Sequence, residues 1–225
     1  MASAPAVLFD IDGTLVDSNY LHVHAWQRAF TEAGLQIQSW RIHRCIGMDG
    51  SSLIEELGSG EVDDPGRLKD LHSTFYAETV GLLRPLPGSR ALLDAVAGLG
   101  LQVVLATSAP EDELSMLRKV LDRDDIVSAI TSSGDVETAK PDPDIVRVAL
   151  ERADVGPDRA VFVGDSVWDV AAAARAGVEC LCLRSGGISQ AELEYAGATA
   201  VFDDPRDLAE HLGDTRIDRL AMSRT

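Results

Sequence analysis

The chain has 225 residues, of which 45% are hydrophobic and 25% are charged, a composition typical of a folded globular protein rather than a disordered one. Its 20 Lys and Arg residues against 37 Asp and Glu residues give a net charge of −17, which disfavours nucleic-acid or membrane-surface partners. The sequence has no apolar run of the ~18 residues that cross a membrane, and its three cysteines have no zinc-site spacing, so we expect a soluble cytoplasmic protein.

Short runs of apolar and β-branched residues alternate along the chain with amphipathic segments. We predict strands at residues 6–9, 101–106, 126–130, 160–163, 178–183 and 199–202, and helices from residue 89 and at 112–121, 142–153, 166–176 and 205–212. Nearly continuous apolar strands are typical of a parallel sheet that helices cover on both faces. The predicted fold class is therefore α/β, with a Rossmann-like parallel sheet. We expect the polar last residues, 214–225, to be frayed.

The segment from residue 18 to residue 84 breaks this alternation, because it offers only helical patterns. Apolar residues recur every four positions between Leu21 and Ala33, and further helices are predicted at 51–57 and 68–80. We therefore predict an all-helical cap domain, residues 17–85, inserted into an α/β core domain made of residues 1–16 and 86–225. Hinges are expected near residues 16–17 and 83–87.

Polar residues gather where the predicted strands end. Four segments contribute them: Asp10 and Asp12, Thr107 and Ser108, Lys140, and Asp165 with Asp169. Because ligands of parallel α/β sheets bind outside the carboxyl ends of the strands, we expect these side chains to lie close together. Neighbouring carboxylates repel each other, and a hard divalent cation such as Mg²⁺ relieves the repulsion. Lysine and hydroxyl groups are then left to bind an oxygen-rich anion, which a phosphoryl group fits.

Each of these segments also has an ordinary explanation. The first could belong to a calcium loop, although Gly13 comes too early for an EF-hand and an apolar strand precedes it. Asp165 could simply cap a helix, and Lys140 could be a solvated surface lysine. The appearance of all four segments in order, each at a strand or loop end, favours the phosphoryl site.

The four motifs, at residues 10–17, 107–108, 140–142 and 164–169, resemble those of the haloacid dehalogenase-like phosphotransferase superfamily. The position of the helical insertion is similar to that in the subgroup that includes phosphoglycolate phosphatase and β-phosphoglucomutase. The resemblance implies that Asp10 is the nucleophile, which forms an aspartyl-phosphate, and that Asp12 is the general acid and base. The namesake dehalogenases lack this second acid, so Asp12 indicates phosphoryl chemistry.

The resemblance also implies the remaining roles in the core. Mg²⁺ would be held by the Asp10 carboxylate, the Asp12 backbone carbonyl and Asp165, with Asp169 orienting a metal-bound water or Lys140. Lys140 would pair with the phosphoryl group and Asp10. The phosphoryl oxygens would be bound by the segments that contain Gly13, Thr107 and Ser108.

Residues that select the substrate are expected in the cap. Ser18, His22 and Trp26 fall on one helical stripe beside the first motif, and a β-phosphoglucomutase-like protein would have a histidine and a tryptophan in similar places. The alternative is that Trp26 belongs to the cap core and His22 to an interface. Arg41, His43 and Arg44 form a basic patch in an acidic chain. We predict that Arg44 or Arg41 contacts the substrate, and a solvated helix face is the alternative.

These observations predict a Mg²⁺-dependent phosphatase that acts on a small phosphorylated metabolite, as a monomer or weak homodimer. Gly164 stands before Asp165 where some relatives carry a second acid, which favours the phosphatase pattern. One alternative is a sugar-phosphate mutase, which would use the same residues. A more remote one is a non-catalytic protein that binds a phosphorylated ligand.

Overall fold

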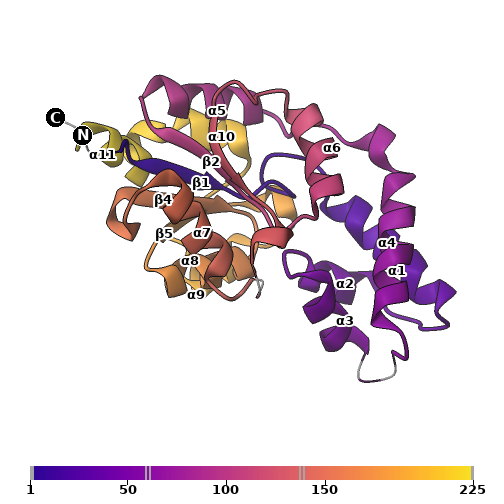
Figure 1. Ribbon diagram of the computed structural model, residues 1–225. Coiled ribbons are helices and arrows are strands. Elements are labelled where there is room, and N and C mark those ends of the chain that lie inside the picture. The colour runs from indigo at the N-terminus through magenta and orange to yellow at the C-terminus, as the bar shows by residue number, and fades with distance from the viewer. Residues whose placement is uncertain (1–2, 59, 61, 137, 139, 224–225) are drawn as a thin grey trace.

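The computed structural model describes residues 3–58, 60, 62–136, 138 and 140–223. A sheet covered by helices forms one lobe, and the helices of the inserted segment form a second lobe beside the ends of the strands (Figure 1). Within the described residues, no helix is long and apolar enough to span a membrane.

The first lobe is built on a six-stranded sheet of order β3-β2-β1-β4-β5-β6, in which every pair of neighbours is parallel. The strands are β1 (Ala6–Phe9), β2 (Gln102–Ala106), β3 (Val127–Thr131), β4 (Ala160–Gly164), β5 (Glu179–Leu183) and β6 (Ala200–Phe202). Each bound lies within one residue of its predicted position. The predicted Rossmann-like α/β fold is confirmed.

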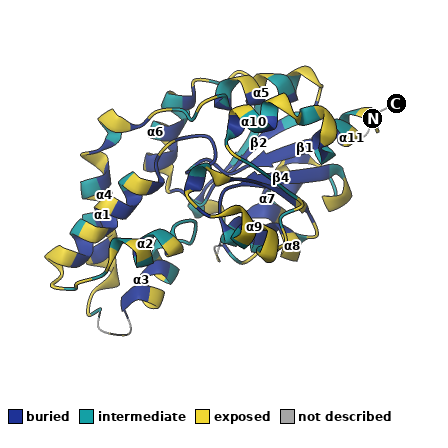
Figure 2. Cartoon of the chain, turned by 180° about the vertical axis from the view of Figure 1, so that it is seen from behind, coloured by how far each residue is buried: buried dark blue, intermediate teal, exposed yellow. Residues whose placement is uncertain are grey.

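Helices bury both faces of this sheet, as the apolar strands require. One face packs against α5 (Ser89–Gly98), α6 (Glu111–Leu121), α10 (Pro205–Glu210) and α11 (Arg216–Met222). The other packs against α7 (Asp144–Ala153), α8 (Val167–Ala176) and α9 (Gln190–Ala196). Alternate residues of β1 divide between the two cores, with Val7 and Phe9 in one and Ala6 and Leu8 in the other. Figure 2 shows the buried strands between helices whose outer faces are exposed. The described residues also form short 3₁₀ helices: η1 (Val80–Leu82), η2 (Ser133–Asp135), η3 (Pro157–Arg159), η4 (Arg184–Gly186) and η5 (Leu212–Asp214).

The expectation that residues 214–225 fray is wrong for the part that the structure describes. This segment forms α11, whose Ile217 and Leu220 are buried in the core beside α5 and α10. Thr215 caps the helix by accepting a hydrogen bond from the backbone N–H of Ile217 at 3.1 Å. Two apolar residues three positions apart are enough to anchor a short helix when a neighbouring groove receives them.

The inserted segment contains α1 (Asn19–Glu32), α2 (Ser39–Cys45), α3 (Gly50–Gly58) and α4 (Pro65–Ala77). These helices share a core of their own, which includes Trp26, Phe30, Ile42, Leu53 and Leu68. A separate core is what an independent cap domain requires. Its limits at residues 17 and 85 stay a prediction.

The two chain segments that connect the lobes run side by side. The backbone N–H of Asp17 donates to the carbonyl of Arg84 at 2.9 Å, and that of Leu86 donates to the carbonyl of Leu15 at 2.9 Å. Between these bonds, Val16 and Pro85 form an antiparallel bridge. The chain therefore enters and leaves the inserted segment at one place.

Candidate active site

The site lies at the carboxyl edge of the sheet, where three adjacent strands end. Asp10 follows β1, Thr107 follows β2 and Asp165 follows β4. Because β1 lies between β2 and β4 in the sheet, the three positions are neighbours in space. This is the edge at which parallel α/β sheets bind their ligands.

Lys140 joins two of the carboxylates in the interior. Its Nζ lies 2.8 Å from Oδ1 of Asp10 and 2.7 Å from Oδ1 of Asp169, and its side chain is only 1% exposed. Burial alone would lower the pKa of Lys140, but the charges of Asp10 and Asp169 outweigh burial and raise the pKa above its ordinary value. Lys140 is therefore a fixed positive charge beside Asp10.

Asp169 is held in place by the N-terminus of α8. Its Oδ2 accepts hydrogen bonds from the backbone N–H groups of Asp165 and Ser166, at 3.2 and 3.0 Å, and from the Ser166 hydroxyl at 2.7 Å. In return, Ser166 Oγ accepts from the Asp169 N–H, which completes a capping box. With both oxygens engaged, Asp169 is well placed to orient Lys140.

Asp165 is oriented from both lobes. Thr14 Oγ1 donates to Oδ1 of Asp165 at 3.0 Å, and Nδ2 of Asn19, at the start of α1, donates to Oδ2 at 2.8 Å. The loop after β5 also approaches this carboxylate closely: a Cβ at Gly186 would lie 1.7 Å from Asp165 Oδ2. Glycine is therefore required at position 186.

Three buried carboxylates thus converge on one small volume. Asp10, Asp165 and Asp169 each place an oxygen within 4.8 Å of the others, while Lys140 supplies one positive charge. Burial raises the pKa of Asp10 to about 7, and burial together with Asp169 and Asp10 raises the pKa of Asp165 well above its ordinary value. A divalent cation relieves such an excess of negative charge, and a site of oxygen ligands fits the hard cation Mg²⁺.

Thr107 and Ser108 line the same pocket from the end of β2. Thr107 Oγ1 accepts a hydrogen bond from the backbone N–H of Ala109 at 3.0 Å, which leaves its own proton available to donate. The Ser108 hydroxyl is buried and has no hydrogen-bond partner among the described residues. A buried hydroxyl without a partner is costly, and a ligand oxygen in the pocket would satisfy it.

Gly13 holds the first motif in shape rather than lining the pocket. It has φ of +70°, and its N–H donates to the carbonyl of Val16 at 2.9 Å. A Cβ at this position would lie 2.3 Å from Nδ2 of Asn19 and 2.5 Å from Oδ2 of Asp165. Gly13 is absent from the pocket lining, and the expectation that its segment binds the phosphoryl group stays a prediction.

Two residues of the inserted segment contact the Asp12 carboxylate. Oδ1 of Asp12 accepts a hydrogen bond from Ser18 Oγ at 2.5 Å and lies 3.3 Å from Nε2 of His22. Burial would raise the pKa of Asp12, but the hydrogen bonds and charge of His22 and the Ser18 bond outweigh it, and the pKa is lowered. Burial would likewise lower the pKa of His22, and Asp12 reverses that shift and raises the pKa. The two shifts favour the form of the pair in which the shared proton lies on His22.

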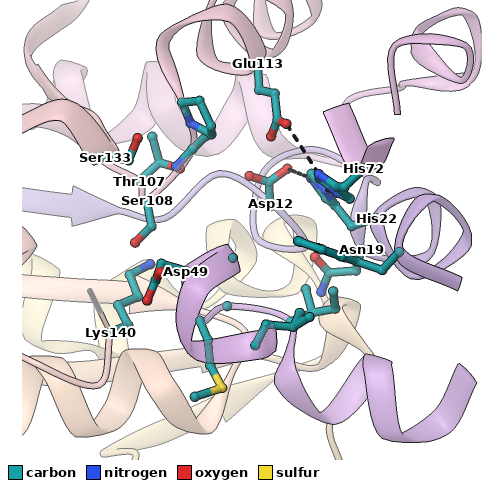
Figure 3. A pocket seen from close by; sticks show the side chains of 18 of the residues that line it. Asp12, Asn19, His22, Asp49, His72, Thr107, Ser108, Glu113, Ser133 and Lys140 are labelled. Carbon is teal, nitrogen blue, oxygen red and sulfur yellow. Dashed lines mark hydrogen bonds and ion pairs between the residues drawn. The ribbon is translucent and has the colours of Figure 1, made fainter. Parts of the chain in front are cut away.

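Two further residues extend this contact, and sequence reasoning missed both. Nδ1 of His22 lies 3.1 Å from Nε2 of His72 on α4, and Nδ1 of His72 lies 3.9 Å from Oε1 of Glu113 on α6. Figure 3 shows the His72–Glu113 contact above the Asp12–His22 contact in the pocket wall. His72 follows Leu68 and precedes Tyr76 at four-residue spacing, so the sequence places a histidine on the buried stripe of a predicted helix, and this could have identified it as a site residue. Nothing in the sequence distinguishes Glu113, because an acid in the first turn of a helix is common.

The pocket, of about 250 Å³, is lined from both lobes. Asp10, Asp12, Lys140 and Asp165 lie at its core end, whereas Trp26, Ile46, Met48, Leu53 and Lys69 belong to the inserted segment. Ser18, His22 and Trp26 therefore do share the face that meets the first motif, because Trp26 lines the pocket and stacks on His72 with ring centroids 4.2 Å apart.

Arg44 does not line this pocket, contrary to the expectation that it contacts the substrate. Its guanidinium pairs with Glu192 of α9, with NH2 and Oε1 2.5 Å apart, and its carbonyl accepts a hydrogen bond from Nε1 of Trp168. Arg41, the other arginine of the basic patch, is also absent from the lining. Arg44 instead faces Glu192 of the core, which sequence alone could not place opposite it.

Comparisons with known proteins agree with this arrangement. Residues 7–183 match the family model of haloacid dehalogenase-like hydrolases. The chain is similar to a phosphoglycolate phosphatase of Rhodospirillum rubrum, with 32% identity over 219 residues that cover 92% of this chain and 90% of that protein. A solved hydrolase from Pseudomonas syringae is 35% identical, covers 93% of this chain and 98% of its own, and has a TM-score of 0.89.

A β-phosphoglucomutase from Clostridium difficile is also similar in structure. It has a TM-score of 0.83 with 18% identity and covers 98% of both chains. At that identity the likeness concerns the fold alone.

Proposed function

The chain belongs to the haloacid dehalogenase-like hydrolases and is a phosphatase of that family, and from this premise we propose that it hydrolyses a small phosphate monoester with Mg²⁺, through an aspartyl-phosphate on Asp10. The observation that carries the proposal is the environment of Asp10. Lys140 lies 2.8 Å away, the other two carboxylates converge on the same volume, and the unpaired Ser108 hydroxyl lines the same pocket.

Bound Mg²⁺, held by Asp10, Asp165 and the carbonyl of Asp12, would neutralise charge on the phosphoryl oxygens. The Asp10 carboxylate attacks phosphorus, the new Asp10–phosphorus bond forms, and the ester bond to the leaving oxygen breaks. Lys140 balances the negative charge, while Thr107 and Ser108 donate hydrogen bonds to the phosphoryl oxygens.

Asp12 carries out the proton transfers of both half-reactions. The shared proton of the His22–Asp12 pair starts on His22. An incoming phosphoryl dianion raises the pKa of Asp12 by repulsion, which favours transfer of this proton from His22 to Asp12. Asp12 donates that proton to the leaving alkoxide. In the second half of the reaction it takes a proton from a water molecule, which attacks phosphorus, breaks the Asp10–phosphorus bond and releases inorganic phosphate.

The size of the pocket supports a small ester as substrate. A volume of 250 Å³ holds about eight water molecules at ~30 Å³ each. Among the described cap residues that line it, Trp26, Ile46, Met48 and Leu53 are apolar and Lys69 is cationic.

The test is phosphate release from a panel of small phosphate monoesters, with Mg²⁺ and with a chelator, on wild type and Asp10→Asn. The panel includes phosphoglycolate and β-glucose 1-phosphate, the latter with and without a sugar bisphosphate. We expect release that the chelator suppresses and that Asp10→Asn abolishes. Release that persists in Asp10→Asn would contradict the proposed nucleophile.

The same assay distinguishes the sugar-phosphate mutase. A mutase returns the phosphoryl group to a bound sugar, so it would convert the 1-phosphate to the 6-phosphate with little free phosphate.

A further inference from the structure

Four side chains that all line the pocket form a continuous line across the contact between the two lobes. Asp12 follows β1 in the core, His22 is on α1, His72 is on α4, and Glu113 is on α6 of the core. Successive contacts measure 3.3, 3.1 and 3.9 Å. The line therefore starts in the core, passes through two helices of the cap, and returns to the core at α6, the helix that reaches toward α4 (Figure 1).

Aromatic rings fix both histidines in this line. The ring of His22 lies against Tyr76, with centroids 4.0 Å apart and planes 10° from parallel. The ring of His72 lies against Trp26, with centroids 4.2 Å apart and planes 19° from parallel. His22, His72 and Glu113 are only 9%, 7% and 6% exposed, although all three line the pocket.

The protonation of the two imidazole rings determines which nitrogen donates and which accepts in each contact. Burial, together with the charge of His22, keeps the pKa of His72 well below its ordinary value, so His72 is neutral and carries one ring proton. Burial raises the pKa of Glu113. In its ionised form this carboxylate, at 3.9 Å from Nδ1, is too far for a hydrogen bond, but its charge favours the tautomer with the proton on Nδ1. Nε2 of His72 is then an acceptor for Nδ1–H of His22, and His22 presents Nε2–H to Asp12.

The result at Asp12 is a fixed orientation. Both Ser18 and His22 engage Oδ1, and Oδ2 has no partner within the described part of the chain. Because Asp12 lines the pocket, Oδ2 is the oxygen available to the leaving group and to water.

We propose that His72 and Glu113 are positioning residues for catalysis, which act through His22 to orient Asp12 and so make its proton transfer depend on contact between the cap and α6. This inference rests on the proposed function. A plain packing contact between the lobes would also place these residues together, but its removal would lower stability without acting through His22.

The test is a double-mutant cycle on kcat for the best substrate of the panel. His22→Phe and His72→Phe keep a planar ring against Tyr76 and Trp26 and remove the ring nitrogens. We expect His22→Phe to lower kcat ~100-fold and His72→Phe to lower it ~10-fold, since general acid–base groups contribute about 10²–10⁴. KM should change less than ~3-fold, and the double variant should match His22→Phe alone, because His72 has no other route to Asp12.

Glu113→Gln tests the far end of the line against Glu111→Gln. Glu111 is exposed in the same first turn of α6, so both variants remove one negative charge from the same helix terminus. We expect Glu113→Gln to lower kcat ~3- to 10-fold and Glu111→Gln to leave it unchanged. Circular dichroism and thermal unfolding confirm that each variant is folded.

The outcomes separate this inference from the proposed function. Wild-type protein that releases no phosphate from any ester would contradict the proposed function, and the positioning role with it. An active wild type in which His72→Phe keeps full kcat, or in which the losses of His22→Phe and His72→Phe multiply in the double variant, would contradict the positioning role alone.

Discussion

At the scale of single residues, the charges of Lys140, Asp10 and Asp169 depend on one another. Lys140 contacts both carboxylates within 2.8 Å and is almost fully buried. Because removal of one partner leaves the others as uncompensated buried charge, Lys140→Met should lower the free energy of unfolding by about 3–5 kcal/mol in chelator. Urea unfolding would measure the loss, and Lys119→Met, at an exposed position of α6, is the matched control. Added Mg²⁺ should restore part of the stability; an undiminished loss with Mg²⁺ would speak against a metal at these carboxylates.

The pKa of Asp10 gives the metal site a pH dependence. Burial raises this pKa to about 7, so below pH ~7 a proton occupies the carboxyl and a metal ion must displace it. Metal affinity therefore rises as pH rises through this value. The increase in Tm on adding Mg²⁺ should be larger at pH ~8 than at pH ~6. Asp10→Asn, which cannot titrate, should show a smaller shift with weaker pH dependence, and equal shifts at both pH values in wild type would contradict the assignment.

At the scale of secondary-structure elements, α11 shows how a short polar helix contributes to the core. Ile217 and Leu220 are 0% and 2% exposed. Leu220→Ala should lower the free energy of unfolding by about 2–4 kcal/mol through lost burial and a cavity. Leu82→Ala, at a leucine that is 64% exposed, should change it by less than ~0.5 kcal/mol. Equal losses in the two variants would mean that α11 is frayed in solution, as the sequence suggested.

The strands and most helices were predictable because their signals are local. Continuous apolar runs specify β1 and β4, and the four-residue spacing from Leu21 to Ala33 specifies α1. Three helices of the described residues were not predicted: α2, α9, which begins with a capping box of Ser189 and Glu192, and α11. The pattern of α11 is too short to be distinguished from a frayed tail without the groove that receives it.

The residues of the candidate site also fall into those that local sequence signals predict and those that they do not. Asp10, Asp12 and Asp165 stand directly at the ends of strands, so the parallel sheet alone brings them together. Glu113 and Arg44 owe their neighbours to how the cap meets the core, and that relation is set by long-range packing. No local pattern shows that Glu113 faces a histidine or that Arg44 faces Glu192.

At the scale of the whole molecule, the cap contacts the core at two places. On one side, Nε2 of His43 lies 2.8 Å from the carbonyl of Gly186, and Arg44 pairs with Glu192. On the other side, His72 faces Glu113. These contacts join the two lobes that together line the pocket.

The Arg44–Glu192 pair is exposed on both sides, at 42% and 43%, and such pairs contribute about 0–1 kcal/mol. Arg44→Ala should therefore change kcat/KM less than ~5-fold for every ester, and Glu192→Ala should produce the same change. Steady-state kinetics of both variants and of the double variant would measure this. A large loss in Arg44→Ala alone, confined to certain esters, would instead reveal the substrate contact that the sequence suggested.

The paired connecting segments have a consequence for how such proteins diversify. Because Val16 and Pro85 are bridged, the core needs no rearrangement to accept a different length of chain between them. The entropy of closing a loop grows only slowly with its length when its ends are already adjacent. The inserted segment can therefore change in length while the register of the sheet stays unchanged, provided that Ser18, Asn19 and His22, which hold Asp12 and Asp165, are kept.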